Sequence, residues 1–424
     1  AGVLGCTNIV LLSDHGMRNI KKLVNLQDID PVYADALTST GNNVLFYTNI
    51  SSEPMKCKKS EYYRVYQRKD DVPLRYHYDH ANVGFPYVNG NPGTMFVRNN
   101  TELADSESKN QKGNHGWDNM DTQMQAMFYT VGPSIRQNVT VPPFQNVNLY
   151  NLFADLMRIR PAPNNGTTGL LDALLVDAPQ RENPFTNWNV EPCHRVTFEN
   201  CDSSGQVPSV SDTKGYILTN DPSVCSISDG KLFLLYSTRL NQTVGMEMRV
   251  GKSTESSEDR VITKMNNEII GRNCEDDGGR SAFMGKALES SLKLTWNEFD
   301  SQSLVQKAVN KLTEKENVRL QIGFVYAEEG PTKYVFVSGF WCLNQGWRKD
   351  NDYCVNEIDT RVESYAIPAR AVDNFNCLDD DSLLFDYRVT IGDIEKLTSL
   401  SLLPKSMPLS IRNKLSQYLP TQEF

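Results

Sequence analysis

The chain has 424 residues, which is enough for two or three domains with sizeable hydrophobic cores. Its 39% hydrophobic and 22% charged residues are ordinary for a folded protein, and its net charge of -9 argues against specific binding to nucleic acid or attraction to anionic membrane. No apolar run reaches the roughly 18 residues of a membrane helix, and neither a membrane anchor nor a signal peptide is visible. Because the chain starts with Ala1 instead of Met, we expect a fragment or a processed product.

Cysteines and glycosylation sequons favour a secreted or cell-surface protein. None of the nine cysteines belongs to a Cys-x-x-Cys pair, which argues against a zinc ribbon or a thioredoxin-type motif. Scattered cysteines are typical of disulfides in extracellular proteins, although an odd number leaves at least one thiol without an intrachain partner. Sequons point to the same compartment because glycosylation marks secreted proteins. The five sequons begin at Asn49, Asn99, Asn138, Asn165 and Asn241.

The part up to about residue 185 alternates short apolar runs with helical patterns, as an α/β layer fold does. Residues 8–12 predict a strand buried on both faces, and residues 18–24 predict the start of a helix. Further strands are expected at residues 44–47 and 94–97. Helical spacing after residue 146 predicts an amphipathic helix, which the turn residues of RPAPNNGTTG end. The apolar face of this helix would carry Val147, Tyr150, Phe153, Ala154 and Met157.

Residues 186–213 are polar and lack a periodic pattern, so we expect a linker between residues 1–185 and a second domain at 214–424. In the second domain, alternating apolar residues predict half-buried strands at 244–250 and 318–324. A further strand is expected in KYVFVSGFW, and the domain is therefore mixed α and β. A helix is marked by the spacing of Leu304, Ala308 and Leu312.

The first candidate for a metal site is the pair Asp14 and His15, which ends the first predicted strand. If that strand is parallel to its neighbours, the pair lies at the carboxyl edge of the sheet, where open α/β sheets bind ligands. A carboxylate oxygen and a neutral imidazole nitrogen both suit Zn²⁺, and Gly16 leaves room for close approach. The alternative is that Asp14 caps a helix and His15 is a core histidine. The dipeptide alone does not decide between these interpretations.

Three further histidines are candidates in the same part of the chain. His115 lies between Gly113 and Gly116, which suggests a loop that brings the imidazole into a crowded site; an incidental histidine on a surface loop is the alternative. His77 and His80 have the i, i+3 spacing of a metal pair, but we favour a surface or packing role for them.

Four segments, in this order and relative spacing, resemble the ectonucleotide pyrophosphatase/phosphodiesterase family. They are CTNIVLLSDHGM, VPLRYHY, GNHGWDNMDTQMQAMFYTVGP and PFQNVNLYNLFADLMRIRPAPNNGT. The resemblance covers residues 1 to about 175, and SDHGM and PAPNNGT are its most specific parts. Near the C-terminus, SYAIPAR and RVTIGDIEKLTSLSLL look like the end of the family's nuclease-like domain, whereas residues 186–300 are only loosely similar.

The resemblance implies an incomplete alkaline-phosphatase-like domain at residues 1–185, the C-terminal part of a type I phosphodiesterase domain. An α+β nuclease-like domain would follow at 214–424. The complete catalytic domain of the family binds two zinc ions, so Asp14 and His15 would bind one zinc and His115 the other. A metal pair, roughly 3.5–4 Å apart, clamps the attacking and leaving oxygens of a displacement at phosphorus.

The family's threonine nucleophile and its remaining zinc ligands precede the SDHGM strand. Thr7 does not match the position of the nucleophile, so no catalytic nucleophile is assigned in this chain. We therefore expect the N-terminal catalytic half to be missing and the chain alone to be an incompetent phosphodiesterase. Without that half, the strand at residues 8–12 would expose an apolar edge, which invites aggregation or binding of the missing half in cis or in trans.

The second domain has no histidine, because His194 is the last one in the chain. A nuclease that uses histidine as its general base is therefore excluded there, as expected of the family's inactive nuclease-like domain. We interpret the acidic runs CEDDGG and CLDDDS as solvated loops. The stretch DNDYCVNE lacks the glycine that a calcium loop needs for its sharp turn, so the sequence does not support a calcium site.

Two functions from different classes remain open. The first is an extracellular zinc phosphodiesterase or nucleotide pyrophosphatase, with nucleotides, or in some members a choline lysophospholipid, as substrate. The second is a catalytically inactive, secreted interaction protein derived from the family, which the absent nucleophile favours. The zinc content of the protein would discriminate between them.

Overall fold

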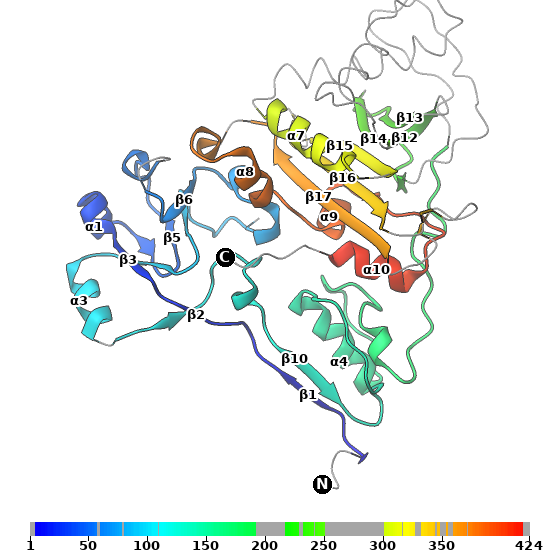
Figure 1. The fold of residues 1–424 in the computed structure, drawn as a ribbon, viewed down its shortest axis with the longest axis horizontal. Coiled ribbons are helices and arrows are strands. Elements are labelled where there is room, and N and C mark those ends of the chain that lie inside the picture. The colour runs from blue at the N-terminus through cyan, green and yellow to red at the C-terminus, as the bar shows by residue number, and fades with distance from the viewer. Residues whose placement is uncertain are drawn as a thin grey trace, which may run out of the picture.

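The computed structural model describes residues 5–56, 60–78, 80–108, 110–191, 217–228, 232–240, 242–250, 301–315, 317–326, 332–343, 346–347, 353–354, 359–370 and 372–418. We refer to residues 5–191 as the N-terminal region and to residues 217–418 as the C-terminal region. Both contain helices and strands, so the expected mixture of α and β is confirmed (Figure 1). Most of the expected linker, and the expected start of the second domain at residue 214, lie outside the described residues.

The N-terminal region contains several small sheets. Its largest sheet is antiparallel and has the order β4-β5-β7-β6, with β4 at Thr38–Ser39, β5 at Asn43–Phe46, β7 at Tyr87–Gly90 and β6 at Tyr63–Tyr66. Beside it, β3 (Lys22–Asn25) and β8 (Thr94–Val97) form a parallel pair. Two antiparallel ribbons complete the strands: β1 (Ile9–Leu12) with β10 (Phe128–Val131), and β2 (Arg18–Asn19) with β9 (Gly113–Asn114). The helices are α1 (Leu26–Ile29), α2 (Val32–Asp35), α3 (Asn100–Ser108) and α4 (Leu149–Met157).

The C-terminal region has three layers. Its six-stranded antiparallel sheet keeps chain order: β12 (Val224–Ser228), β13 (Leu232–Ser237), β14 (Gln242–Val250), β15 (Val318–Tyr326), β16 (Thr332–Cys342) and β17 (Thr360–Pro368). One face packs against α7 (Gln302–Thr313) and α8 (Asp380–Asp386). The other face packs against α9 (Ile391–Thr398), α10 (Leu409–Gln417) and the small pair of β11 (Leu218–Thr219) and β18 (Leu400–Ser401).

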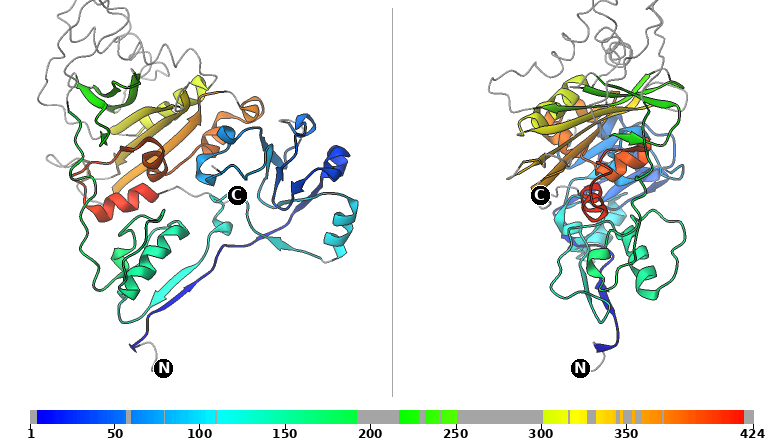
Figure 2. Two further views of the ribbon diagram at one scale, coloured as in Figure 1. Left: turned by 180° about the vertical axis from the view of Figure 1, so that it is seen from behind. Right: turned by 90° about the vertical axis from the view of Figure 1, so that its right-hand side faces the viewer.

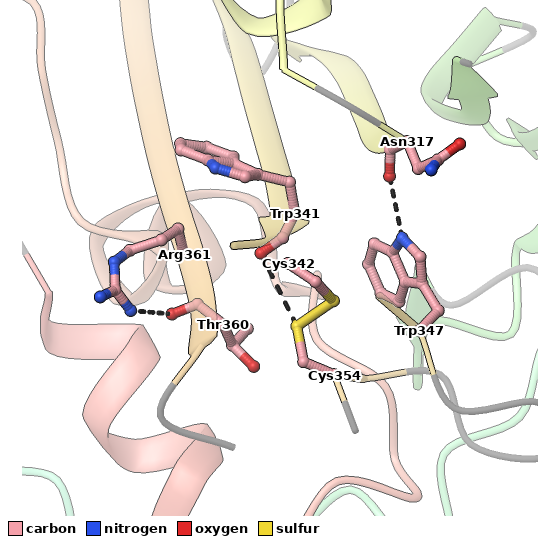
Figure 3. Close-up of a disulfide and its surroundings, with 7 residues drawn as sticks. All are labelled: Asn317, Trp341, Cys342, Trp347, Cys354, Thr360 and Arg361. Carbon is pink, nitrogen blue, oxygen red and sulfur yellow. Dashed lines mark hydrogen bonds between the residues drawn. A yellow bond between two sulfur atoms is a disulfide. The ribbon is translucent and has the colours of Figure 1, made fainter. Parts of the chain in front are cut away.

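The position of the six-stranded sheet between two helical layers explains why its residues are buried. The strands and the helix expected in the second domain are present as β14, β15, β16 and α7. The alternation along residues 318–324 predicts one solvated face, but every residue from 318 to 325 is buried because helices cover both faces of β15. Cys342, the last residue of β16, is also crosslinked to Cys354 by a disulfide (Figure 3). Cys225 and Cys377 are disulfide-bonded as well, so the expectation of disulfides is confirmed.

Two expectations about the N-terminal region are wrong. Residues 18–24 form strands, because Arg18 pairs with β9 and Lys22–Asn25 pairs with β8; the helix begins only at Leu26, where the Asn25 side chain caps it. The first strand is present as β1, but it is exposed instead of buried on both faces. Its pairing explains this difference: β1 pairs along one edge only among the described residues, and its partner β10 is antiparallel.

The helix expected after residue 146 is confirmed as α4, but of the face predicted to be apolar only Ala154 is fully buried, and the helix packs mainly through other residues. Leu149, Leu152 and Leu156 contact Phe128 and the neighbouring apolar residues, whereas Tyr150 and Met157 are exposed. The helix carries two apolar stripes, and the spacing of residues did not show which one would face the core. No helix within the described ranges has the length and apolar character to cross a membrane.

Candidate metal centre

Asp14 and His15 lie directly beyond β1, on a segment that is held tightly against the chain after Asp121. The backbone N–H of Gly16 donates to the carbonyl of Met124 at 3.0 Å. A Cβ at residue 16 would lie 1.9 Å from the carbonyl oxygen of Gln123, so only glycine fits this approach. Glycine is thus required at residue 16 for contact with another backbone segment, whereas the room it was expected to leave for a metal stays a prediction. The chain leaves Gly16 into strand β2 instead of into a helix.

His115 reaches the same place from the other side. It follows β9, whose Asn114 pairs with Arg18 of β2, so the ribbon aligns the histidine with the segment that precedes Arg18. Gly116 adopts a φ of +100°, which a residue with a side chain rarely adopts, and this turn lets the loop leave the site. The imidazole rings of His15 and His115 are stacked, with centroids 3.5 Å apart and planes 16° from parallel.

The ring of His15 is oriented by its own backbone. Its Nδ1 lies 2.7 Å from the carbonyl oxygen of Gly16, which can only accept, so Nδ1 donates to it and Nε2 is the ring nitrogen left for a metal. Nε2 is 3.4 Å from Oδ2 of Asp14. Two ligands of one tetrahedral zinc, at bond lengths of about 2.0–2.2 Å, lie roughly 3.3–3.6 Å apart. The donor types and this separation therefore both fit zinc.

Asp14, His15 and His115 do not form a closed ligand set. Over the described ranges, no three His, Cys, Asp or Glu side chains are grouped closely enough to hold one ion. The structure thus brings together the three residues that the sequence singled out. The ring of His115 is stacked on that of His15, and the carboxylate of Asp14 lies beside Nε2 of His15.

Two buried Arg–Asp pairs brace the loops that carry the histidines. Nη1 of Arg18 lies 2.5 Å from Oδ2 of Asp121, and Nη2 of Arg75 lies 2.5 Å from Oδ2 of Asp118. Burial alone would raise the pKa of Asp118, but the charge of Arg75 and hydrogen bonds lower it. The sequence analysis missed all four residues. The available signal was two aspartates spaced three apart just after His115, whose arginine partners are remote in sequence.

His77 and His80 lie elsewhere, as the preferred interpretation expects. Nε2 of His77 is 3.6 Å from Oδ1 of Asp393 in α9, and Nδ1 of His80 accepts a hydrogen bond from the backbone of Asn82. The acidic run CLDDDS is not a loop: Asp379 caps α8 by accepting from the N–H of Ser382 at 2.9 Å.

The sequons differ in accessibility. Asn49, Asn138 and Asn165 are exposed, whereas Asn99 is partly buried and accepts from the N–H of Glu102. Asn241 lies outside the described residues. Glycosylation of these asparagines stays a prediction.

Comparison with known proteins supports the resemblance. Residues 1–118 match the family model for type I phosphodiesterase / nucleotide pyrophosphatase. An ectonucleotide pyrophosphatase/phosphodiesterase of Caenorhabditis elegans is 25% identical over 98% of this chain and 54% of that protein. A venom phosphodiesterase of Macrovipera lebetinus is 34% identical, over 48% of this chain and 24% of the venom protein. Family member 3 of Bos taurus is 32% identical, over 50% of this chain and 24% of the bovine protein.

These matches relate the chain, whose fold is mixed α/β, to phosphodiesterases and nucleotide pyrophosphatases. The chain is similar to part of the proteins of the ectonucleotide pyrophosphatase/phosphodiesterase family. It spans about half the length of the nematode relative and about a quarter of the other two.

Proposed function

We propose that this chain is part of an extracellular zinc-dependent phosphodiesterase or nucleotide pyrophosphatase. In this proposal, Asp14 and His15 bind one zinc ion and His115 binds a second. The meeting of the three candidate ligands carries it: the imidazoles of His15 and His115 are stacked, and Oδ2 of Asp14 lies 3.4 Å from Nε2 of His15. The names of venom and ectonucleotide relatives support an extracellular location.

The donors present would supply only part of such a centre. When bound, a zinc pair stabilises the attacking and leaving oxygens of a displacement at phosphorus. The residues of this chain would orient the ions: the carbonyl of Gly16 fixes the tautomer of His15, and the Arg18–Asp121 pair ties the two histidine segments together. We propose that the nucleophile and the remaining ligands come from further family sequence. The substrate would be a nucleotide phosphodiester or pyrophosphate.

Zinc titration of the 424-residue chain tests the proposed ligands. We expect weak zinc binding, because the ligand set is incomplete, and a further loss of affinity of about 10–100-fold in His115→Ala. His80→Ala is the matched control, since His80 is remote from His15, and it should leave the affinity unchanged. Equal affinities in the two variants would contradict the ligand assignment.

The two functional classes can be separated by an activity assay. The protein for this assay is purified from its source organism. Hydrolysis of a p-nitrophenyl nucleotide ester that requires zinc and is lost in His115→Ala is the expected result. If the zinc-bound protein cleaves neither this ester nor a choline lysophospholipid, the result would support the alternative, a catalytically inactive interaction protein.

We propose that further family sequence also covers the open face of the β1–β10 ribbon. Phe128 packs toward α4, so strand alternation places Ile9, Leu11, Tyr129 and Val131 on the opposite face, where each is between 39% and 66% exposed. The ribbon projects away from the six-stranded sheet (Figure 2). Exposed apolar strands of this kind favour association. The matched relatives are two to four times longer than the stretch that aligns, which supports an intramolecular cover.

A charge placed on this face tests that proposal. We expect the 424-residue chain to self-associate, and Leu11→Lys with Tyr129→Lys to shift it toward monomer in light scattering after size exclusion. Leu37→Lys is the control, because Leu37 is 63% exposed outside the ribbon. A wild-type chain that is monodisperse and monomeric would sink the proposal.

A further inference from the structure

Arg75 is a buried cation that contacts both regions of the chain. It belongs to the short 3-10 helix η4 (Leu74–Tyr76), and it is 2% exposed. Within the N-terminal region, its Nη2 and Nε lie 2.5 Å and 3.3 Å from the two carboxylate oxygens of Asp118. Its Nη1 donates to the backbone carbonyl of Asp386, the last residue of α8 in the C-terminal region. One guanidinium thus joins a helix end to a loop of the other region.

Asp118, the partner of Arg75 in the N-terminal region, belongs to the loop that carries His115. Asp118 is three residues beyond His115 on the same loop, and its Oδ1 accepts from the N–H of Met120 at 2.9 Å. Asn119 also donates to the backbone carbonyl of Arg75 at 3.0 Å. The loop is therefore attached to η4 through both the side chain and the backbone of Arg75.

Asp386 is also held by more than one contact. Arg64 of β6 contacts the Oδ1 atom of Asp386, so the end of α8 is held by two arginines of the N-terminal region. Carbonyl groups at the C-terminus of a helix accept hydrogen bonds favourably from cations. Because a buried charge is costly without partners, Arg75 is stable only when Asp118 and the end of α8 are both in place.

We propose that Arg75 is a positioning residue through which α8 of the C-terminal region sets the conformation of the His115 loop, and so the metal affinity at His115. The metal part rests on the proposed function, whereas the loop part does not. The C-terminal region would then contribute to the site without supplying a ligand. Its contribution would be the backbone carbonyl of Asp386.

Arg75→Lys is the informative variant. Lysine keeps the positive charge, but its single ammonium group cannot make the forked contact with Asp118 and reach Asp386 at once. Arg412→Lys is the matched control. Arg412 is 1% exposed and binds Glu395, Ser401 and the carbonyl of Leu403 in the C-terminal region. It also lies 3.8 Å from the ring centroid of Phe185 in the N-terminal region, so it is a buried arginine that joins the two regions without contacting the His115 loop.

Two measurements on the full chain decide the matter. Amide hydrogen exchange should rise about 10-fold at residues 113–120 in Arg75→Lys, and zinc affinity should fall by about 10-fold, as for loss of an orienting contact. Arg412→Lys should lower the melting temperature without changing either quantity at the His115 loop. A third variant, Arg75→Lys with His115→Ala, should show no further loss of zinc affinity beyond His115→Ala alone.

The outcomes separate this inference from the proposed function. Unchanged exchange at residues 113–120 in Arg75→Lys would overturn the coupling, as would an equal rise in Arg412→Lys. If the wild-type chain bound no zinc at all, the ligand assignment would fail, and hydrogen exchange would still show whether α8 controls the loop.

Discussion

Gly16→Ala is expected to destabilise the N-terminal region by about 3 kcal/mol, at the upper end of what overpacking costs. The added Cβ would meet the carbonyl oxygen of Gln123 at 1.9 Å, its carbonyl carbon at 2.8 Å and the carbonyl oxygen of Gln125 at 2.9 Å. All three are backbone atoms and cannot rotate away. The chain must therefore move by an ångström or more, which breaks the bond from Gly16 to Met124.

Urea unfolding, followed by tryptophan fluorescence, measures this effect. Gly5→Ala is the matched control, because a Cβ there meets no atom within 4 Å. The same movement displaces His15, so zinc affinity should fall together with stability. A Gly16→Ala protein as stable as Gly5→Ala would mean that the approach of the two segments is looser than described.

Asp386→Asn is expected to remove a pH dependence of stability worth about 3 kcal/mol. Burial raises the pKa of Asp386 from 3.8 to about 6, even though Arg64 and Arg75 lower it, and the charge of Asp118 raises it further. Between these two pKa values, the folded protein binds a proton that the unfolded chain releases. The free energy of unfolding is therefore highest below about pH 4 and falls as the pH rises through 6. Asparagine cannot ionise and so avoids this loss.

Unfolding free energies at pH 4 and pH 7 test the sign. Relative to wild type, Asp386→Asn should gain about 2 kcal/mol of the total between these values, whatever constant offset the loss of the Arg64 pair adds. Asp381→Asn, on the same helix with a carboxylate that is 74% exposed, provides the control. A wild-type protein whose stability rises over this interval relative to Asp386→Asn would show that ion pairing outweighs burial.

Local sequence patterns predicted the secondary-structure elements whose formation depends on residues close together in the sequence. Alternation located β14 and β15, and helical spacing located α4 and α7. The spacing of α4 could not show its packed face, because both of its stripes are apolar and the choice depends on Phe128 and its neighbours. The prediction of a helix at residues 18–24 was wrong for a related reason. Their pairing partners β8 and β9 lie too far along the chain to influence a local sequence pattern.

The candidate site was predictable in part through family resemblance. Resemblance singled out Asp14, His15 and His115, and the structure brings the two imidazoles into contact. Arg18, Arg75, Asp118 and Asp121 were not found, since a buried ion pair leaves no periodic trace in the sequence. Zinc binding, the nuclease-like character of the C-terminal region and the domain limits stay predictions.

The pairing of β1 with β10 also has a consequence for biosynthesis. Leu12 aligns with Phe128, so β1, once it has left the ribosome, waits for more than a hundred further residues before its partner exists. At ordinary translation rates this delay is on the order of 10 s. Most neighbouring strands of the C-terminal sheet, by contrast, are close in the sequence, as β15 and β16 are, and only the pairing of β14 with β15, in which Val250 aligns with Val318, spans a long stretch among the described strands. The nascent chain is thus expected to present the apolar residues of β1 to chaperones well before the metal-ligand loops can meet.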